Sequence, residues 1–207
     1  MRMRKVDQRS PSKYVMPEIQ LADAVKPDAA KEARQAKRLD RLAEFLPKGD
    51  PLRGEKLFND PAKSLCITCH VKEDKGVDFG PDLTRIGAIR TERDLLEAIV
   101  YPSSTIARYY ELVTVDGNQG QAAGLLRRDS VGEIVLGPAP GAEQTIPFKE
   151  IKKAKYSNLS LMPEVFDNLL KPEEIADVVA YLKEAKGPVS SAPKDEIPPH
   201  HAIDLPG

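Results

Sequence analysis

The chain contains only two cysteines, and they lie two residues apart in Cys66-Ile67-Thr68-Cys69-His70. Two thiols at this spacing can add across the two vinyl groups on one edge of a porphyrin. The imidazole that follows the second thiol then lies under the ring, where its neutral nitrogen can bind iron. Because Cys-x-x-Cys-His is the attachment pattern of a c-type haem, we expect Cys66 and Cys69 to hold one covalently attached haem and His70 to bind its iron.

Two other kinds of site share part of this pattern. A Cys-x-x-Cys pair can be a thioredoxin-like redox centre, but that motif accompanies a βαβ pattern, which the sequence does not show. A tetrahedral zinc site needs four ligands at suitable spacing, whereas the other two histidines, His200 and His201, are adjacent and lie in a distant Pro-rich tail. A chance match to a five-residue pattern is the remaining alternative.

The charge balance of the 207 residues argues against nucleic acid as a partner. Lys and Arg number 31, Asp and Glu number 32, and the formal net charge is −1, whereas nucleic-acid binding favours a basic face. No apolar run has the length needed to cross a bilayer. Covalent haem attachment normally takes place outside the cytoplasm, so we expect a periplasmic or other extracytoplasmic location. Residues 1–5 are basic like the start of a signal peptide, but no apolar segment follows them.

The hydrophobic pattern divides the chain into three parts. Residues 1–49 are expected to form an extended arm and a helix over 28–46, which either lies solvated on the domain or binds a partner. Residues 50–186 are expected to form a compact, mainly α-helical domain that contains the motif. Residues 187–207 are rich in proline without apolar periodicity, so they are expected to be disordered or laid along a partner.

Three helices are predicted in the compact domain, starting at Asp50-Pro51, at Thr91 and at Pro172. Between the second and third helices the hydrophobic period changes from that of a helix to that of a strand. Short runs of β-branched and aromatic residues, separated by turn signals such as Asp116-Gly117, indicate strands. The predicted fold is therefore mainly α, with a small antiparallel β insertion over about 108–155 and an extended arm at each end.

The residue on the other side of the iron decides what a haem can do. An open position binds small ligands or supports catalysis, whereas His and Met together give an electron-transfer haem with a raised potential. Met162 is the main candidate, because Pro163 restrains its backbone to an extended conformation before the last helix. Met16, which also precedes a proline, and His200 or His201 are the alternatives.

The order of these features resembles class I cytochrome c. In that family a first helix with a glycine and an aromatic residue precedes Cys-x-x-Cys-His, and a Gly-Pro loop, a middle helix, a Met loop and a final helix follow. The matching positions are Gly54, Phe58, Cys66, Cys69, His70, Gly80-Pro81, 91–101, Met162 and Tyr181-Leu182. The resemblance implies that the terminal helices cross near Gly54 and Tyr181. It also implies that the Pro81 carbonyl accepts a hydrogen bond from the His70 ring.

The β insertion makes the chain most similar to the haem-binding domain of the planctomycete and verrucomicrobial type. That family carries a comparable series of motifs in the same order, and the resemblance covers residues 54–183 or so. The matching motifs are Gly54–Phe58, Gly80–Thr84, Pro102-Ser103, Tyr109-Tyr110, Asp116-Gly117, Ser160–Pro163 and Ala180–Leu182. The resemblance says nothing about residues 1–49 and 188–207.

The function expected from these residues is single-electron transfer through a low-spin His/Met haem, not enzymatic catalysis. The two arms favour a subunit of a larger redox or respiratory complex, membrane-associated or secreted, over a diffusing shuttle, because arms that order on binding can wrap large surfaces. A ligand sensor or small haem enzyme with an open sixth position, and a structural role, are the alternatives. The lysines at 149, 152, 153 and 155 either dock an acidic partner or form an ordinary solvated stretch.

Overall fold

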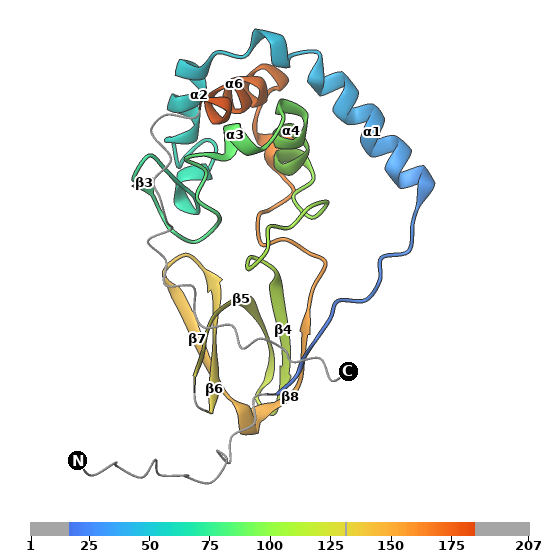
Figure 1. The fold of residues 1–207 in the computed structure, drawn as a ribbon, viewed down its shortest axis with the longest axis vertical. Helices are drawn as coiled ribbons and strands as arrows, with labels where there is room; N and C mark the ends of the chain where they lie inside the picture. The colour runs from blue at the N-terminus through green and yellow to red at the C-terminus, as the bar shows by residue number, and fades with distance from the viewer. Residues whose placement is uncertain (1–16, 131, 185–207) are drawn as a thin grey trace, which may run out of the picture. The chain divides into compact units, whose positions relative to one another are not determined.

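The computed structural model describes residues 17–130 and 132–184, and the chain divides into two compact units. We call them the β unit, with residues 17–27 and 105–162, and the helical unit, with residues 28–104 and 163–184. Figure 1 shows the elements of each unit in chain order from blue to red. The chain passes from one unit to the other after Pro27, Ser104 and Met162.

The helical unit contains the cysteine motif and all of the predicted helices. Its elements are α1 (Ala29–Ala43), η1 (Leu46–Lys48), α2 (Pro51–Phe58), η2 (Cys66–Thr68), the hairpin β2 (Val71–Lys72) and β3 (Lys75–Gly76), α3 (Ile86–Ile89), α4 (Glu92–Val100), α5 (Phe166–Leu169) and α6 (Pro172–Lys183). The predicted starts of α2 and α4 are confirmed by their caps. The Asp50 carboxylate accepts from the backbone of Leu52 and Arg53, and Thr91 and Asp94 form a reciprocal capping box.

Helices α2 and α6 cross in backbone contact at Gly54. A Cβ added to Gly54 would lie 1.9 Å from the Asp177 carbonyl oxygen and 2.8 Å from the Tyr181 Cβ, so only glycine fits there. One turn further along α2, the buried rings of Phe58 and Tyr181 pack edge to face with centroids 5.6 Å apart. Figure 1 shows these two helices side by side. This is the crossing that the resemblance to class I cytochrome c implies near Gly54 and Tyr181.

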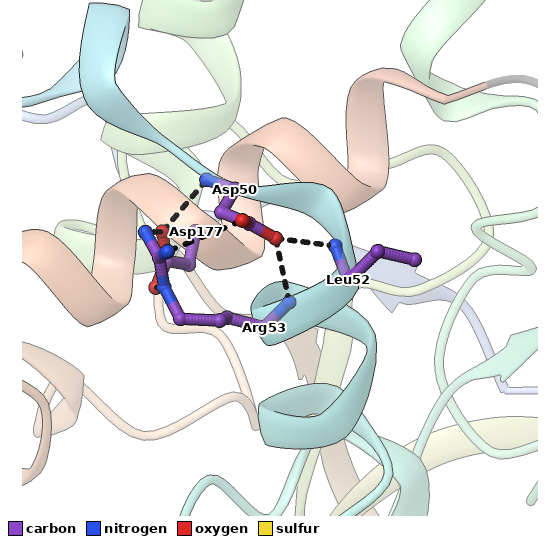
Figure 2. Close-up of polar contacts among 4 residues, drawn as sticks. All are labelled: Asp50, Leu52, Arg53 and Asp177. Atoms are coloured by element: carbon purple, nitrogen blue, oxygen red, sulfur yellow. Dashed lines mark hydrogen bonds and ion pairs between the residues drawn. The ribbon is translucent and has the colours of Figure 1, made fainter.

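A buried carboxylate fastens the start of α2 to the same crossing. Asp177 is 3% exposed, and it accepts hydrogen bonds from the Asp50 backbone N–H at 2.7 Å and from Arg53 Nε and Nη2 at 2.8 and 2.7 Å. Figure 2 shows the Arg53 guanidinium turned toward Asp177, while Asp50 caps the helix beside it. Because a buried charge is costly unless paired and hydrogen-bonded, these contacts satisfy Asp177 where it lies.

The β unit is a six-stranded sheet with the order β1-β8-β4-β5-β6-β7. Its strands are β1 (Ile19–Gln20), β4 (Leu112–Gly117), β5 (Gly120–Ser130), β6 (Glu133–Ala139), β7 (Ala142–Pro147) and β8 (Ile151–Tyr156), with η3 (Phe148–Glu150) before β8. All pairs are antiparallel except β1 with β8. The sheet has its own apolar core, made by Val113, Val115, Ile134, Leu136, Ile146 and Ala154.

The prediction of a mainly α fold with a small β insertion is wrong, because the structure is mixed α/β. Two strands account for most of the difference. Within the β insertion predicted over about 108–155, residues 149–156 were interpreted as leading out of the strands, yet Ile151–Tyr156 form β8 and Ala154 is fully buried in the sheet core. Ile19–Gln20 were interpreted as part of an extended arm, yet they pair with β8, and Ile19 packs against the same core. Neither strand has a local pattern, because both are specified by pairing with distant residues.

We predict that Gly54→Ala destabilises the helical unit by about 3 kcal/mol, because the new Cβ overlaps the backbone of α6. Leu52→Ala is the matched control, since it changes an exposed side chain on the same helix and is expected to alter the free energy of unfolding by no more than about 0.5 kcal/mol. Urea unfolding followed by helical circular dichroism measures both. Equal stabilities for the two variants would contradict the backbone contact.

Candidate haem-binding site

The cysteine motif is wound into a single tight turn. The Cys66 carbonyl accepts from the backbone N–H of Cys69 at 3.2 Å and of His70 at 3.0 Å. In a 3₁₀ turn, side chains three residues apart lie on the same face, so the two thiols are presented together. Leu65 starts the turn with φ +61, a conformation that non-glycine residues seldom adopt. Both cysteines are free and half-buried.

The His70 ring is oriented by the loop that follows it. Its Nδ1 lies 2.8 Å from the Pro81 carbonyl oxygen, and since a carbonyl only accepts, Nδ1 carries the proton. Nε2 is then left with a lone pair, which is the form that binds a metal. Burial is the main influence on the ring and lowers the pKa of His70, against the opposing effect of the Pro81 carbonyl. The imidazole is therefore held neutral near neutral pH.

Gly80 allows the loop to approach the imidazole closely. A Cβ at this position would lie 2.7 Å from His70 Cε1 and 2.9 Å from Nδ1. The backbone N–H groups of Phe79 and Gly80 both donate to the Cys69 carbonyl, at 3.1 and 2.6 Å. The Gly80-Pro81 dipeptide therefore packs on the motif with its backbone, and this explains why the sequence needs glycine before the accepting proline.

A buried lysine joins the motif to the last helix, and the sequence analysis missed it. The side chain of Lys72 is fully buried; its Nζ donates to Glu73 Oε1 at 3.0 Å and to the Glu184 carbonyl at 3.2 Å, and lies 4.2 Å from the centroid of the Tyr181 ring. Burial, with Glu73 and Glu55 nearby, raises the pKa of Tyr181 to about 12. No local signal marks this lysine, because a lysine in a two-residue strand is ordinarily solvated.

The predicted sixth ligand belongs to the other unit. Met162 is half-buried at the end of the β unit, and its backbone N–H donates to Ser160 Oγ at 3.1 Å. His70 belongs to the helical unit, so the pairing of Met162 with His70 stays a prediction. Met16, His200 and His201 lie outside the described residues.

The side chains of the motif fit a covalently bound haem. They offer two thiols on one face of a turn and a neutral imidazole with a free Nε2 beside them. Leu65 and Val77, which flank the motif, are 41% and 42% exposed, so apolar surface is available beside the thiols for a porphyrin to cover. These are the attachment and ligation groups that the chemistry requires.

The two competing interpretations of the motif, a redox-active dithiol and a zinc site, fit this geometry less well. Burial raises the pKa of the Cys66 thiol, whereas redox-active Cys-x-x-Cys motifs lower the pKa of their nucleophilic thiol. Within residues 17–130 and 132–184, no group of three or more His, Cys, Asp and Glu side chains is placed to hold a metal ion. The described part of the chain therefore offers no ligand set for tetrahedral zinc.

Comparison with known proteins adds no assignment. No family model matches the sequence, and no curated protein matches it significantly. The interpretation of the site consequently depends on the motif and on the geometry around it. Among the described residues, no helix combines the length and the apolar character that a membrane span needs.

We predict that Gly80→Ala displaces the His70 ring, because the added methyl group overlaps it. The haem-loaded variant should gain a high-spin ferric fraction in its optical spectrum and lose about 1–3 kcal/mol of stability from overpacking. Asp78→Ala, an exposed change in the same loop, is the control and should match wild type. A Gly80→Ala protein with the wild-type spectrum and stability would show that the contact with His70 does not constrain the ligand.

Proposed function

We propose that this protein is a monohaem c-type cytochrome that transfers single electrons. In this proposal Cys66 and Cys69 hold the haem through thioethers, and His70 and Met162 are the axial ligands. The observation that carries it is the hydrogen bond between His70 Nδ1 and the Pro81 carbonyl. His70 directly follows the Cys-x-x-Cys pair in the sequence, and this hydrogen bond leaves its Nε2 as the available metal ligand.

The residues of the chain have distinct parts in this function. A bound haem supplies an iron that cycles between the ferrous and ferric states. The two thiols fix its position, and the Pro81 carbonyl fixes the tautomer and the orientation of His70 and raises the basicity of Nε2. Gly80 keeps the loop packed against the imidazole. A thioether from Met162 would complete the coordination and raise the potential.

The contacts that hold the motif in place suit an electron-transfer centre. The turn that carries the motif is hydrogen-bonded to residues 77–81, and Lys72 joins the next strand to α6 through Glu184 and Tyr181. A centre held on several sides reorganises little when its charge changes. We also propose redox proteins as partners, in a larger extracytoplasmic complex, because covalent haem attachment normally occurs outside the cytoplasm.

We predict that the protein, purified from a host that matures c-type haem, shows a low-spin spectrum and does not bind carbon monoxide. Met162→Ala should create carbon monoxide binding and lower the midpoint potential by on the order of 0.1 V, within the ~0.8 V that axial ligation spans. Spectra of the oxidised and reduced protein, with and without carbon monoxide, and a redox titration measure these changes.

Met16→Ala is the control for the prediction, because Met16 also precedes a proline and is the competing thioether. It should leave the spectrum and the potential unchanged. Carbon monoxide binding by the wild-type protein as ready as that by Met162→Ala would contradict the His/Met assignment. It would favour instead a sensor or a small haem enzyme with an open sixth position.

A further inference from the structure

Helix α1 separates its charges by sign around its axis. Five basic residues fall within an arc of about 120° when successive residues are placed 100° apart, and Glu32 and Asp40 fall outside that arc. The five are Lys31, Arg34, Lys37, Arg38 and Arg41. They form a continuous basic stripe along the helix, which we call the α1 basic stripe.

The stripe places like charges where they repel one another. Its members are neighbours at spacings of three or four residues, as in Lys31 with Arg34, Arg34 with Lys37 and Arg38, and Arg41 with Lys37 and Arg38. Like-charge pairs at these spacings destabilise a helix. Helix stability alone would favour alternating charges, so this arrangement has a cost that folding does not explain.

One member of the stripe anchors the helix and the others do not. Arg38 forms an ion pair with Asp167 of α5, and Leu39 beside it is buried. Arg93 of α4 binds Asp40 on another side of α1 at 2.7 Å. These contacts hold α1 in place, whereas Lys31, Arg34, Lys37 and Arg41 are exposed and form no ion pair within the described part of the chain.

The stripe lines an open, shallow groove. The groove has a volume of about 500 Å³, and Gln35 and the largely buried Tyr101 complete its lining. From Lys31 to Arg41 the stripe extends for about 15 Å at the rise of an α-helix. An extended peptide of about five residues covers the same length.

We propose that the groove along the α1 basic stripe binds an acidic segment of a partner protein. Two of the four cations outside the Arg38–Asp167 ion pair are arginines, Arg34 and Arg41, and planar guanidinium groups bind carboxylates in a bidentate manner. Gln35 adds hydrogen-bonding groups for the backbone of such a segment. The proposal does not rest on the haem, since every residue in it lies on α1 or at the end of α4.

The lining of the groove disfavours other anionic partners. Helices that bind membrane surfaces insert large apolar side chains, and the residues that line this groove include one aromatic side chain, Tyr101, which is itself buried, and no aliphatic one. Nucleic-acid binding favours a domain with a marked basic excess, whereas Glu32 and Asp40 lie on the same helix and the net charge of the chain is −1. A short acidic peptide segment is the ligand whose size and charge the groove matches.

The test measures binding of a fluorescent peptide with about five consecutive glutamates to the full chain by fluorescence anisotropy. The groove variant is Arg34→Gln/Lys37→Gln/Arg41→Gln, which removes three exposed charges. The control is Lys48→Gln/Lys56→Gln/Arg90→Gln, which removes the same charge from exposed positions that do not line the groove. We expect binding that weakens with salt, is about tenfold weaker in the groove variant, and is unchanged in the control.

Each other outcome overturns the proposal. No binding by wild type, or equal weakening in both triple variants, would show that the groove is not a specific site. Tighter groove-dependent binding of vesicles with phosphatidylserine, or of a single-stranded oligonucleotide, would assign the stripe to a membrane or to nucleic acid.

The groove variant should unfold at or above the wild-type temperature, because removing three like charges relieves their repulsion. Lys37→Gln alone, which changes one exposed residue, should weaken peptide binding in the same direction.

Discussion

Helices α2 and α6 meet backbone to backbone at Gly54, and the position of the cysteine motif depends on that contact. The motif leaves α2 after a short loop, and residues 71–72 that follow it are fastened to the end of α6 by Lys72. Asp177 binds the first turn of α2 at the other side of the crossing. The segment with the two thiols and the imidazole is thus supported at both ends by the same helix pair.

The polar groups of the site have few alternative hydrogen-bonding roles, and these roles determine its chemistry. A carbonyl can only accept, so the Pro81 contact with Nδ1 determines which nitrogen of His70 is free. Burial lowers the pKa of the His70 ring and raises the pKa of the Cys66 thiol. A raised thiol pKa disfavours a redox dithiol, whose nucleophilic thiol has a lowered pKa. The same segment therefore has the groups that a c-type haem needs, held by backbone and buried contacts and not by solvent-exposed side chains.

Sequence signals of short range predicted much of the helical unit. The caps at Asp50 and Thr91, the Gly-Pro loop and the apolar face of α6 are each encoded within a few residues, and the resemblance to cytochromes added the contact between His70 and Pro81. The interactions that were missed join distant residues. Ile19 pairs with Ala154, and Lys72 reaches Glu184, while the segments around them carry no periodicity of their own. The mixed α/β fold was mistaken for a mainly α fold for this reason.

The most direct test of this account is the intact mass of the protein, measured under denaturing conditions after expression in a host that matures c-type haem. The account predicts a mass increase of one haem that survives denaturation and that maps, after digestion, to the peptide containing Cys66, Cys69 and His70. A chain recovered without added mass from a host that loads other c-type cytochromes, or with haem that dissociates on denaturation, would contradict it.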